Sequence, residues 1–312
     1  MKYKKLIDPE LRSIARHVPY NKLIIICANI FQTISFHFTK VPKGVMNRNI
    51  NIKGYKDLKL KVNIFEPSNI NEKLPCLIYV HGGAFSYKAS AYHKKLACLY
   101  AMKVKCKVYF PDYHLTPKYP YPAAYEDILK LYQYIMKNHE ELGIDNERIG
   151  IAGDSAGASL AALVCNHYER LNLTRPCLQM LIYPLTDVTM QTDSMKKFID
   201  TPLWNSKNNK RMWSYYCKNL KGNHIYKASP MHSSLPQFIP DTYVETAQYD
   251  CLHDEGMIYA KKLCKSGANV VLNETKGTIH GYDSAFHAKI AKTHIEKRIL
   301  FLRNSFNKSL SD

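Results

Sequence analysis

The chain has 312 residues, 46% of them hydrophobic and 22% charged, and it carries a formal net charge of +18. This composition is typical of a soluble globular protein, and the absence of repeats, low-complexity tracts and long linkers favours one domain with insertions over residues 1–312. The lysines are spread along the whole chain and do not gather in one arm or on one helix face. We therefore expect a solubilising surface and no nucleic-acid partner, while steering of anionic substrates stays open.

Nine cysteines are present, an odd number, and none belongs to a Cys-x-x-Cys pair. Most of them lie in apolar runs, which favours reduced, buried thiols over a disulfide framework or a zinc site. We therefore predict a cytoplasmic protein without a metal centre.

The N-terminal segment, residues 1–45, contains an apolar run at 23–31. This run of about nine residues is too short to span a bilayer. It also starts late and lacks the small-residue cleavage site of a signal peptide. We expect residues 1–45 to be helical and packed on the body, without stable membrane insertion. Peripheral membrane contact by this segment is the alternative.

Residues 50–53 and 58–64 alternate apolar and polar side chains, which predicts an antiparallel hairpin at a sheet edge. Beyond them, short apolar runs alternate with helical patterns. The predicted strands are 75–80, 106–111, 148–152, 178–183, 242–249 and 270–274, and the predicted helices are 123–138, 156–168, 254–266 and 283–302. This alternation predicts an α/β fold with a mostly parallel central sheet and helices on both faces.

Between residues 187 and 230 the pattern breaks down into polar and aromatic residues. A connection that long usually forms a lid or a binding region, so we expect it to form a helical cap over the site together with residues 1–45. Substrate contact and a small core within the cap are equally open roles for its aromatic residues, Trp204, Trp213, Tyr215 and Tyr216.

A Gly-x-Ser-x-Gly motif, Gly153-Asp154-Ser155-Ala156-Gly157, stands between a predicted strand and a predicted helix. This context describes a nucleophile elbow, in which the turn is too tight for side chains two positions either side of the serine. The serine hydroxyl then projects at a helix N-terminus, where the N–H of Ala156 faces any oxyanion formed beside it. The alternative is a tight crossover that needs two glycines and performs no chemistry.

A serine hydroxyl becomes an effective nucleophile only when a base takes its proton and a carboxylate orients that base. Asp250 directly follows the predicted strand 242–249, and His280 follows the strand 270–274 after a short loop. Ligands bind beyond the carboxyl ends of strands in open α/β sheets. The order Ser155, Asp250, His280 is the order of α/β-hydrolases.

Other acids and histidines fit these roles less well. His287 and His294 fall on a helical pattern and lack a strand-end position, while His253 is too close to Asp250 in the sequence to reach across from another strand. Asp254 is the rival carboxylate, but we expect it to be a helix N-cap.

The strand at 75–80 ends in His81-Gly82-Gly83-Ala84. Small residues let backbone N–H groups approach a developing negative charge, so we predict that this loop provides the second half of an oxyanion hole. We expect His81 to fix the loop and not to act as a base. A glycine-rich turn without a ligand is the alternative.

These motifs together resemble the hormone-sensitive-lipase-like group of α/β-hydrolase esterases, over about residues 55–300. Five blocks carry the resemblance in the family's order: His81-Gly82-Gly83-Ala84 for His-Gly-Gly-Gly; Asp112-Tyr113-His114-Leu115-Thr116-Pro117 for Asp-Tyr-Arg-Leu-Ala-Pro; Gly153-Asp154-Ser155-Ala156-Gly157 for the elbow; Asp250-Cys251-Leu252-His253-Asp254-Glu255 for Asp-Pro-Leu-x-Asp-Glu; and His280-Gly281-Tyr282 for His-Gly-Phe.

The resemblance implies that Ser155 is the nucleophile, His280 the general base and then acid, and Asp250 the orienting carboxylate. Three backbone N–H groups would hold the oxyanion, those of Gly82, Gly83 and Ala156. Supporting positions are His81, Ala84, which shapes the loop behind the donors, and Asp154, a structural acid beside the nucleophile. The family needs no metal or organic cofactor.

Four positions depart from the family's pattern. Ala84 replaces the third glycine, and its methyl group narrows the approach to the acyl carbon. His114 stands where arginine is usual and Lys118 where an acid is usual, so the salt links that brace that loop are in doubt. Cys251 replaces a proline, which we expect to matter little.

The resemblance therefore implies a serine carboxylester hydrolase that acts on short acyl esters, acetyl to about hexanoyl, through an acyl-enzyme. Two alternatives stay open: a non-catalytic small-molecule receptor on the same fold, and an amidase or acyltransferase at the same site. We expect a small-molecule ester as the partner. Whether residues 283–302 and the last strand form a homodimer edge is also open.

Overall fold

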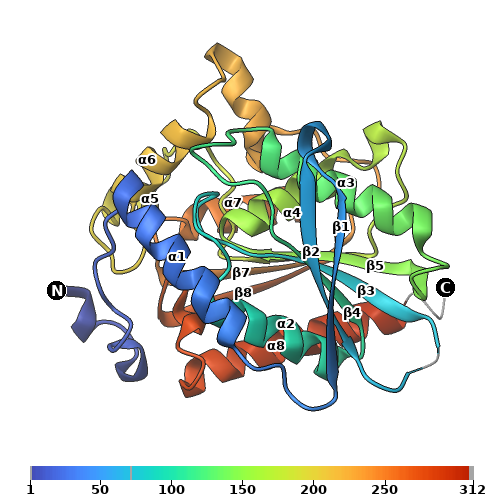
Figure 1. Cartoon of the computed structure of the whole chain (residues 1–312). Helices are drawn as coiled ribbons and strands as arrows, with labels where there is room; N and C mark the ends of the chain where they lie inside the picture. The colour runs from blue at the N-terminus through green and yellow to red at the C-terminus, as the bar shows by residue number, and fades with distance from the viewer. Residues whose placement is uncertain (1, 71, 309–312) are drawn as a thin grey trace.

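The computed structural model describes residues 2–70 and 72–308, and an eight-stranded sheet runs through this part of the chain (Figure 1). Its strands are β1 (Val45–Lys53), β2 (Lys59–Pro67), β3 (Leu74–Val80), β4 (Lys107–Pro111), β5 (Ile144–Asp154), β6 (Leu178–Ile182), β7 (Asp241–Tyr249) and β8 (Val270–Ile279). They lie in the order β1-β2-β4-β3-β5-β6-β7-β8. The β1–β2 and β2–β4 pairs are antiparallel and the remaining pairs parallel, which confirms the mostly parallel sheet with a hairpin at one edge.

Helices cover both faces of the sheet and enclose two separate apolar cores, as the alternation of patterns predicts. One face carries α3 (Ala123–Asn138), α4 (Ala156–His167) and α7 (His253–Lys265), and the other carries α2 (Ala91–Val104) and α8 (Lys289–Lys308). The sequence pattern does not predict α2. Its buried positions include His93 and Lys94, and these polar residues interrupt the apolar periodicity of the helix.

Two element boundaries differ from the prediction in ways that matter for the site. β8 continues to Ile279, so His280 follows the strand directly and not after a loop. The last helix begins at Lys289 and not at residue 283, because a short 3-10 turn at Tyr282–Ser284 comes first. The turn follows Gly281, whose φ of +66° lies in the left-handed region that favours glycine.

The N-terminal segment is only partly helical, which corrects the expectation for residues 1–45. It contains 3-10 turns at Lys2–Lys5 and Pro9–Leu11 and the helix α1 (Lys22–Phe38), with irregular chain between them. Its residues 16 and 18 accept hydrogen bonds from Leu203 N (2.9 Å) and Asn208 Nδ2 (2.8 Å). In Figure 1, α1, α5 (Asp193–Lys197) and α6 (Ser206–Tyr216) are drawn on the same side of the molecule. The cap assignment stays a prediction.

No helix in the described part of the chain is long and apolar enough to cross a membrane. All nine cysteines are free thiols, and most are buried, as expected. Cys27 on α1 and Cys264 on α7 are exposed, which the sequence does not indicate. β8 lies at an edge of the sheet, and a dimer formed through it stays a prediction.

A buried ionic network ties α8 to the sheet beneath the loop that carries His280. Arg298 is 1% exposed, and its guanidinium donates to Asp283 Oδ2 (2.6 Å) and to Glu245 Oε1. The hydroxyl of Tyr282 donates to Glu245 Oε1 at 2.7 Å, and that of Tyr183 to Asp283 Oδ1 at 2.7 Å. Burial opposes ionisation of Glu245, but the charge of Arg298 outweighs it and holds the pKa of that carboxyl below its usual value.

Removing the guanidinium should destabilise the fold strongly, because two carboxylates would stay buried without a counter-charge. We expect Arg298→Met to lower the free energy of unfolding by about 3–5 kcal/mol. Arg303→Met, on the exposed side of the same helix, is the matched control and should change it by less than about 1 kcal/mol. Urea unfolding of both variants measures the difference. Equal effects would show that the network contributes little.

Candidate active site

The elbow at Ser155 connects β5 to α4 by a turn that only glycine neighbours permit. Ser155 has φ of +54° and ψ of −119°, a strained conformation for a residue with a side chain. A Cβ atom added to Gly157 would overlap the carbonyl oxygen of Val80, and one added to Gly153 would overlap the backbone of Gly157. The requirement for glycine at both positions is therefore steric, because backbone atoms fill the space where a side chain would start.

Three side chains from the ends of β5, β7 and β8 meet in one chain of hydrogen bonds. Ser155 Oγ lies 2.9 Å from His280 Nε2, and His280 Nδ1 lies 2.6 Å from Asp250 Oδ2. Because the carboxylate can only accept, the imidazole carries its proton on Nδ1 and leaves Nε2 free to accept from the serine. The backbone N–H of Leu252 donates to Asp250 Oδ1 at 3.0 Å, which holds the carboxylate in this orientation.

Of the two glycines in the loop after β3, one lines the cavity beside Ser155 and the other does not. Gly83 and Ala84 line a cavity together with Ser155, whereas the amide of Gly82 faces the buried carboxylate of Asp154. Ala84 takes a φ of +55°, so its methyl group stands in a backbone conformation that usually requires glycine. The first residue of α4 is Ala156, so its N–H is among those that the helix leaves unpaired.

His81 is fully buried at the base of this loop. Its ring stacks on Tyr113 with centroids 4.4 Å apart, and its Nδ1 lies 2.6 Å from the carbonyl oxygen of Gly82. Burial and the neighbouring His93 lower the pKa of His81 to about 3. The imidazole is therefore neutral near pH 7 and packs inside the loop.

Asp154, beside Ser155, is held by residues that the sequence pattern does not indicate. Its carboxylate accepts from the hydroxyl groups of Tyr79 (3.1 Å) and Tyr92 (3.3 Å), and it lies 3.2 Å from His93 Nε2. Burial opposes its ionisation, but His93 outweighs that effect and keeps the pKa of Asp154 below its usual value. Two of these partners, Tyr92 and His93, come from the start of α2, a helix that the apolar pattern of the sequence does not predict.

The salt links that the substitutions put in doubt are partly replaced. His114 Nδ1 lies 2.7 Å from Asp127 Oδ2, and the same carboxylate accepts from the backbone N–H of Tyr55 at 2.7 Å. The ammonium group of Lys118 lies over the ring of Tyr119, 4.9 Å from its centroid. The loop that follows β4 is thus braced by a histidine in the place of the family's arginine.

Asp254 does not cap its own helix, which corrects the expectation from the sequence. The N-cap of α7 is Leu252, and Asp254 Oδ2 instead accepts from the N–H of Ser194 (2.7 Å) at the start of α5. His253 Nδ1 lies 2.7 Å from the other oxygen of Asp254. His294 lies on α8, with its Nδ1 3.0 Å from the amide of Asn273. The alternative acid Asp254 and the alternative histidines His253 and His294 therefore have their partners away from Ser155.

The cavity in front of Ser155 has a volume of about 190 Å³. Trp204 lines it, with its ring centroid 6.2 Å from that of His280. Tyr216 packs away from it, stacked on Phe85 with centroids 3.6 Å apart, and Trp213 lies 6.2 Å from Tyr216. The aromatic residues of the 187–230 segment therefore divide between a wall of the cavity and a small core.

Comparison with known proteins assigns this arrangement to a class. The profile of a family described as having the α/β-hydrolase fold matches residues 77–284. Carboxylesterase NlhH of Mycobacterium tuberculosis is 28% identical over 242 residues, 76% of this chain and 75% of that protein. Ethyl acetate hydrolase of Pseudomonas putida is 28% identical over 226 residues, 72% of this chain and 71% of that protein.

Among solved structures, a bacterial heroin esterase superposes with a TM-score of 0.89 at 26% identity, covering 98% of this chain and 99% of that one. The chain therefore belongs to the α/β-hydrolase fold family, in the group of carboxylesterases related to hormone-sensitive lipase. It is accordingly an enzyme of the carboxylesterase type. The resemblance carried by the sequence motifs is confirmed.

The steric account of the elbow makes a direct prediction for Gly157→Ala. Because the atom that would block the new methyl group is a backbone oxygen of β3, we expect the free energy of unfolding to fall by about 3 kcal/mol. Gly267→Ala is the matched control, since Gly267 has a positive φ but open space around it, and should cost about 1 kcal/mol. Denaturant unfolding compares the two; a smaller loss for Gly157→Ala would contradict the account.

Proposed function

We propose that this enzyme hydrolyses short-chain carboxylic esters with Ser155 as nucleophile, His280 as general base and acid, and Asp250 as the orienting carboxylate. The observation that carries the proposal is the unbroken hydrogen-bonded chain from Ser155 Oγ through the imidazole of His280 to Asp250. In that arrangement the base already touches the proton it must remove, and the buried carboxylate stabilises the imidazolium that forms.

The reaction proceeds in two steps. Ser155 Oγ attacks the ester carbonyl carbon as its proton passes to His280 Nε2, and the carbonyl oxygen becomes an oxyanion. Collapse of this intermediate breaks the bond to the alcohol oxygen, which leaves with the proton from His280. Water then gives a proton to His280 and attacks the acyl-enzyme, and the second collapse returns the proton to Ser155 and releases the acid.

Backbone N–H groups from two elements hold the oxyanion. The cavity lining supports Gly83 and Ala84 as donors from the loop after β3, because the amide of Gly82 is directed at Asp154. Ala156 supplies the third N–H from the start of α4, where the helix dipole also favours negative charge. We propose Ala84 in place of Gly82 as the second donor from this loop. The proposed reaction needs no metal or organic cofactor.

The size of the cavity supports a short acyl group. About 190 Å³ lies in front of Ser155, and Tyr183 and Trp204 form rigid parts of its wall. A small ester fits such a space, and a relative is named for hydrolysis of ethyl acetate. We place the preference between acetyl and about hexanoyl esters, with methylene groups beyond that limit excluded by the aromatic wall.

Removing the nucleophile tests the assignment of Ser155. We expect Ser155→Ala to lower kcat for p-nitrophenyl acetate by at least about 10⁴-fold without unfolding the protein, and to abolish labelling by a fluorophosphonate probe. Ser159→Ala, one turn further along α4 and also buried, is the matched control and should keep both activities. A wild-type protein that fails to react with the probe would instead support a non-catalytic receptor.

An acyl-length series tests the cavity wall. We expect kcat/KM on p-nitrophenyl esters to fall sharply beyond hexanoyl in the wild type, and Trp204→Leu to raise the ratio of decanoyl to butanoyl turnover. Trp213→Leu, in the small core beside Tyr216, should leave that ratio unchanged. The ratio is measured within one sample, so partial unfolding does not alter it. Comparing anilide with ester turnover in the same assay separates an amidase from an esterase.

A further inference from the structure

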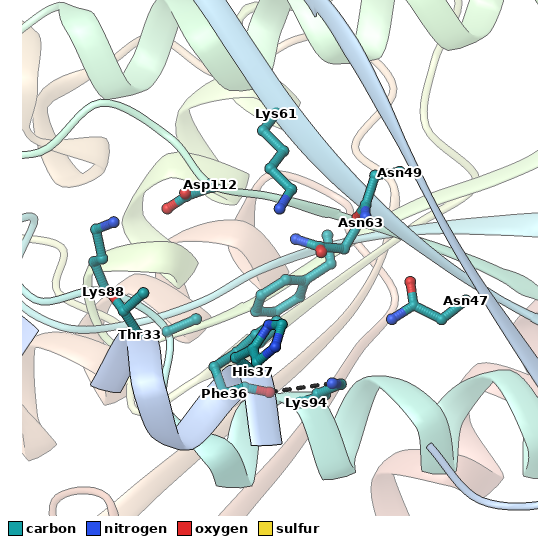
Figure 2. Close-up of a pocket in the computed structure, with 12 residues that line it drawn as sticks. Thr33, Phe36, His37, Asn47, Asn49, Lys61, Asn63, Lys88, Lys94 and Asp112 are labelled. Carbon is teal, nitrogen blue, oxygen red and sulfur yellow. Dashed lines mark hydrogen bonds between the residues drawn. The ribbon is translucent and has the colours of Figure 1, made fainter. Parts of the chain in front are cut away.

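A second cavity, of about 350 Å³, lies between α1, the β1–β2 hairpin and the start of α2 (Figure 2). The loop of residues 87–90 separates it from the catalytic cavity, and Lys88 lines both. Its volume lies within the range of small-molecule binding sites. The esterase mechanism uses none of the residues on its floor.

The floor of this cavity is polar where the architecture calls for apolar residues. Lys61 and Asn63 alternate along β2 on one face of the sheet, and Asn49 on β1 is paired with Asn63. α1 and α2 cover this face, and a sheet face covered by helices is normally apolar. Asn63 is buried at such a position, whereas Lys61 and Asn49 are exposed, so a polar partner has most to compensate at Asn63.

Asn63 shows this most directly. It is 8% exposed, and its side-chain amide forms no hydrogen bond with any described residue of the chain. In Figure 2 its amide points into the cavity, beside the ammonium group of Lys61. Buried side-chain amides almost always have partners in folded proteins. The polar atoms of Asn63 are not among the fully buried atoms without a partner, so its amide is accessible from the cavity, where a ligand can take the place of water.

The cavity also collects positive charge. Lys94 is only 6% exposed, and its ammonium group donates to the backbone oxygen of Phe36 at 3.1 Å, which leaves two of its three N–H groups to face the cavity. Burial lowers the pKa of Lys94 because it disfavours the charged form, and an anion beside the ammonium group would offset this effect. Neither Lys61 nor Lys88 has an ion-pair partner within the described chain, and Asp112 is the acidic residue among the described residues that line the cavity.

We propose that this second cavity binds a small phosphate-bearing group that also carries hydroxyl groups. Lys61, Lys88 and Lys94 line different sides of the cavity, and their ammonium groups can donate to phosphate oxygens, as can the amide N–H of Asn63. The carboxylate of Asp112 and the amide oxygens of Asn47 and Asn49 accept from hydroxyl groups. This pairing of cations with acceptors distinguishes a hydroxylated phosphate from a simple inorganic anion.

Two sources supply such a group: a soluble metabolite and the headgroup of an anionic phospholipid. The outer face of α1 bears on this choice, because it exposes a stripe of large apolar side chains close to the cavity. The stripe consists of Leu23, Ile26, Ile30, Ile34 and Phe38, each between 52% and 77% exposed. A headgroup in the cavity would place its acyl chains where this stripe could contact them.

Calorimetric titration with glycerol 3-phosphate at low ionic strength tests the soluble source. We expect saturable binding to the wild-type protein, weakened about tenfold in Lys61→Gln and in Asn63→Leu through the loss of a charge-assisted hydrogen bond. Lys59→Gln is the matched control, because it removes the same charge from an exposed position two residues away on β2 and should bind as the wild type does. Thermal melting checks that each variant is folded.

Co-sedimentation with vesicles tests the lipid source. Binding to phosphatidylglycerol vesicles but not to phosphatidylcholine vesicles, reduced in Lys61→Gln and kept in Lys59→Gln, assigns the cavity to a headgroup. The proposal is overturned if neither probe binds, or if Lys59→Gln weakens binding as much as Lys61→Gln does, which would indicate net charge alone. Binding is measured without ester turnover, so this outcome is independent of the fate of Ser155.

Discussion

The close contact between the first turn of α4 and the end of β3 determines how the site around Ser155 is arranged. The backbone at Gly157 lies against the carbonyl oxygen of Val80, two residues after the strained turn at Ser155, whose φ is +54°. The chain leaving Val80 continues directly into the loop of residues 81–84. Ser155 and the loop of residues 81–84 are therefore positioned by one backbone contact, so their relative geometry does not depend on flexible side chains.

The other half of the site is set by strand register. Tyr249 of β7 is paired with Ile279 of β8, so the next residue on each strand, Asp250 and His280, emerges side by side at the same sheet edge. A register shift in this pair precedes the last paired residues and brings them level. Beneath them Arg298 fixes the following turn to β7. Asp250 Oδ2 and His280 Nδ1 thus meet at 2.6 Å because of backbone pairing reinforced by a buried ion network.

The sequence predicts those parts of the site that depend on short local patterns. Buried runs mark the strands, two glycines mark the elbow, and strand ends place Asp250 and His280 in the right order. It fails where partners are distant along the chain. The hydrogen bond from the N–H of Ser194 to Asp254 and the orientation of the Gly82 amide toward Asp154 depend on segments that meet only in the folded protein. A one-dimensional pattern carries no signal for such contacts.

The helix α2 shows why a helix with buried polar residues is not predicted from the spacing of apolar residues. The adjacent residues His93 and Lys94 of α2 are both buried, but they face different cavities. His93 lies against Asp154 beside Ser155, and Lys94 lies against Phe36 in the second cavity. Adjacent helical residues diverge by about 100°, so one turn of helix can reach both cavities at once. Polar groups at these positions cost stability unless each finds its own partner, and a helix with two polar buried sides cannot show a single apolar stripe. α2 therefore lacks a regular apolar pattern because it lies between two polar cavities.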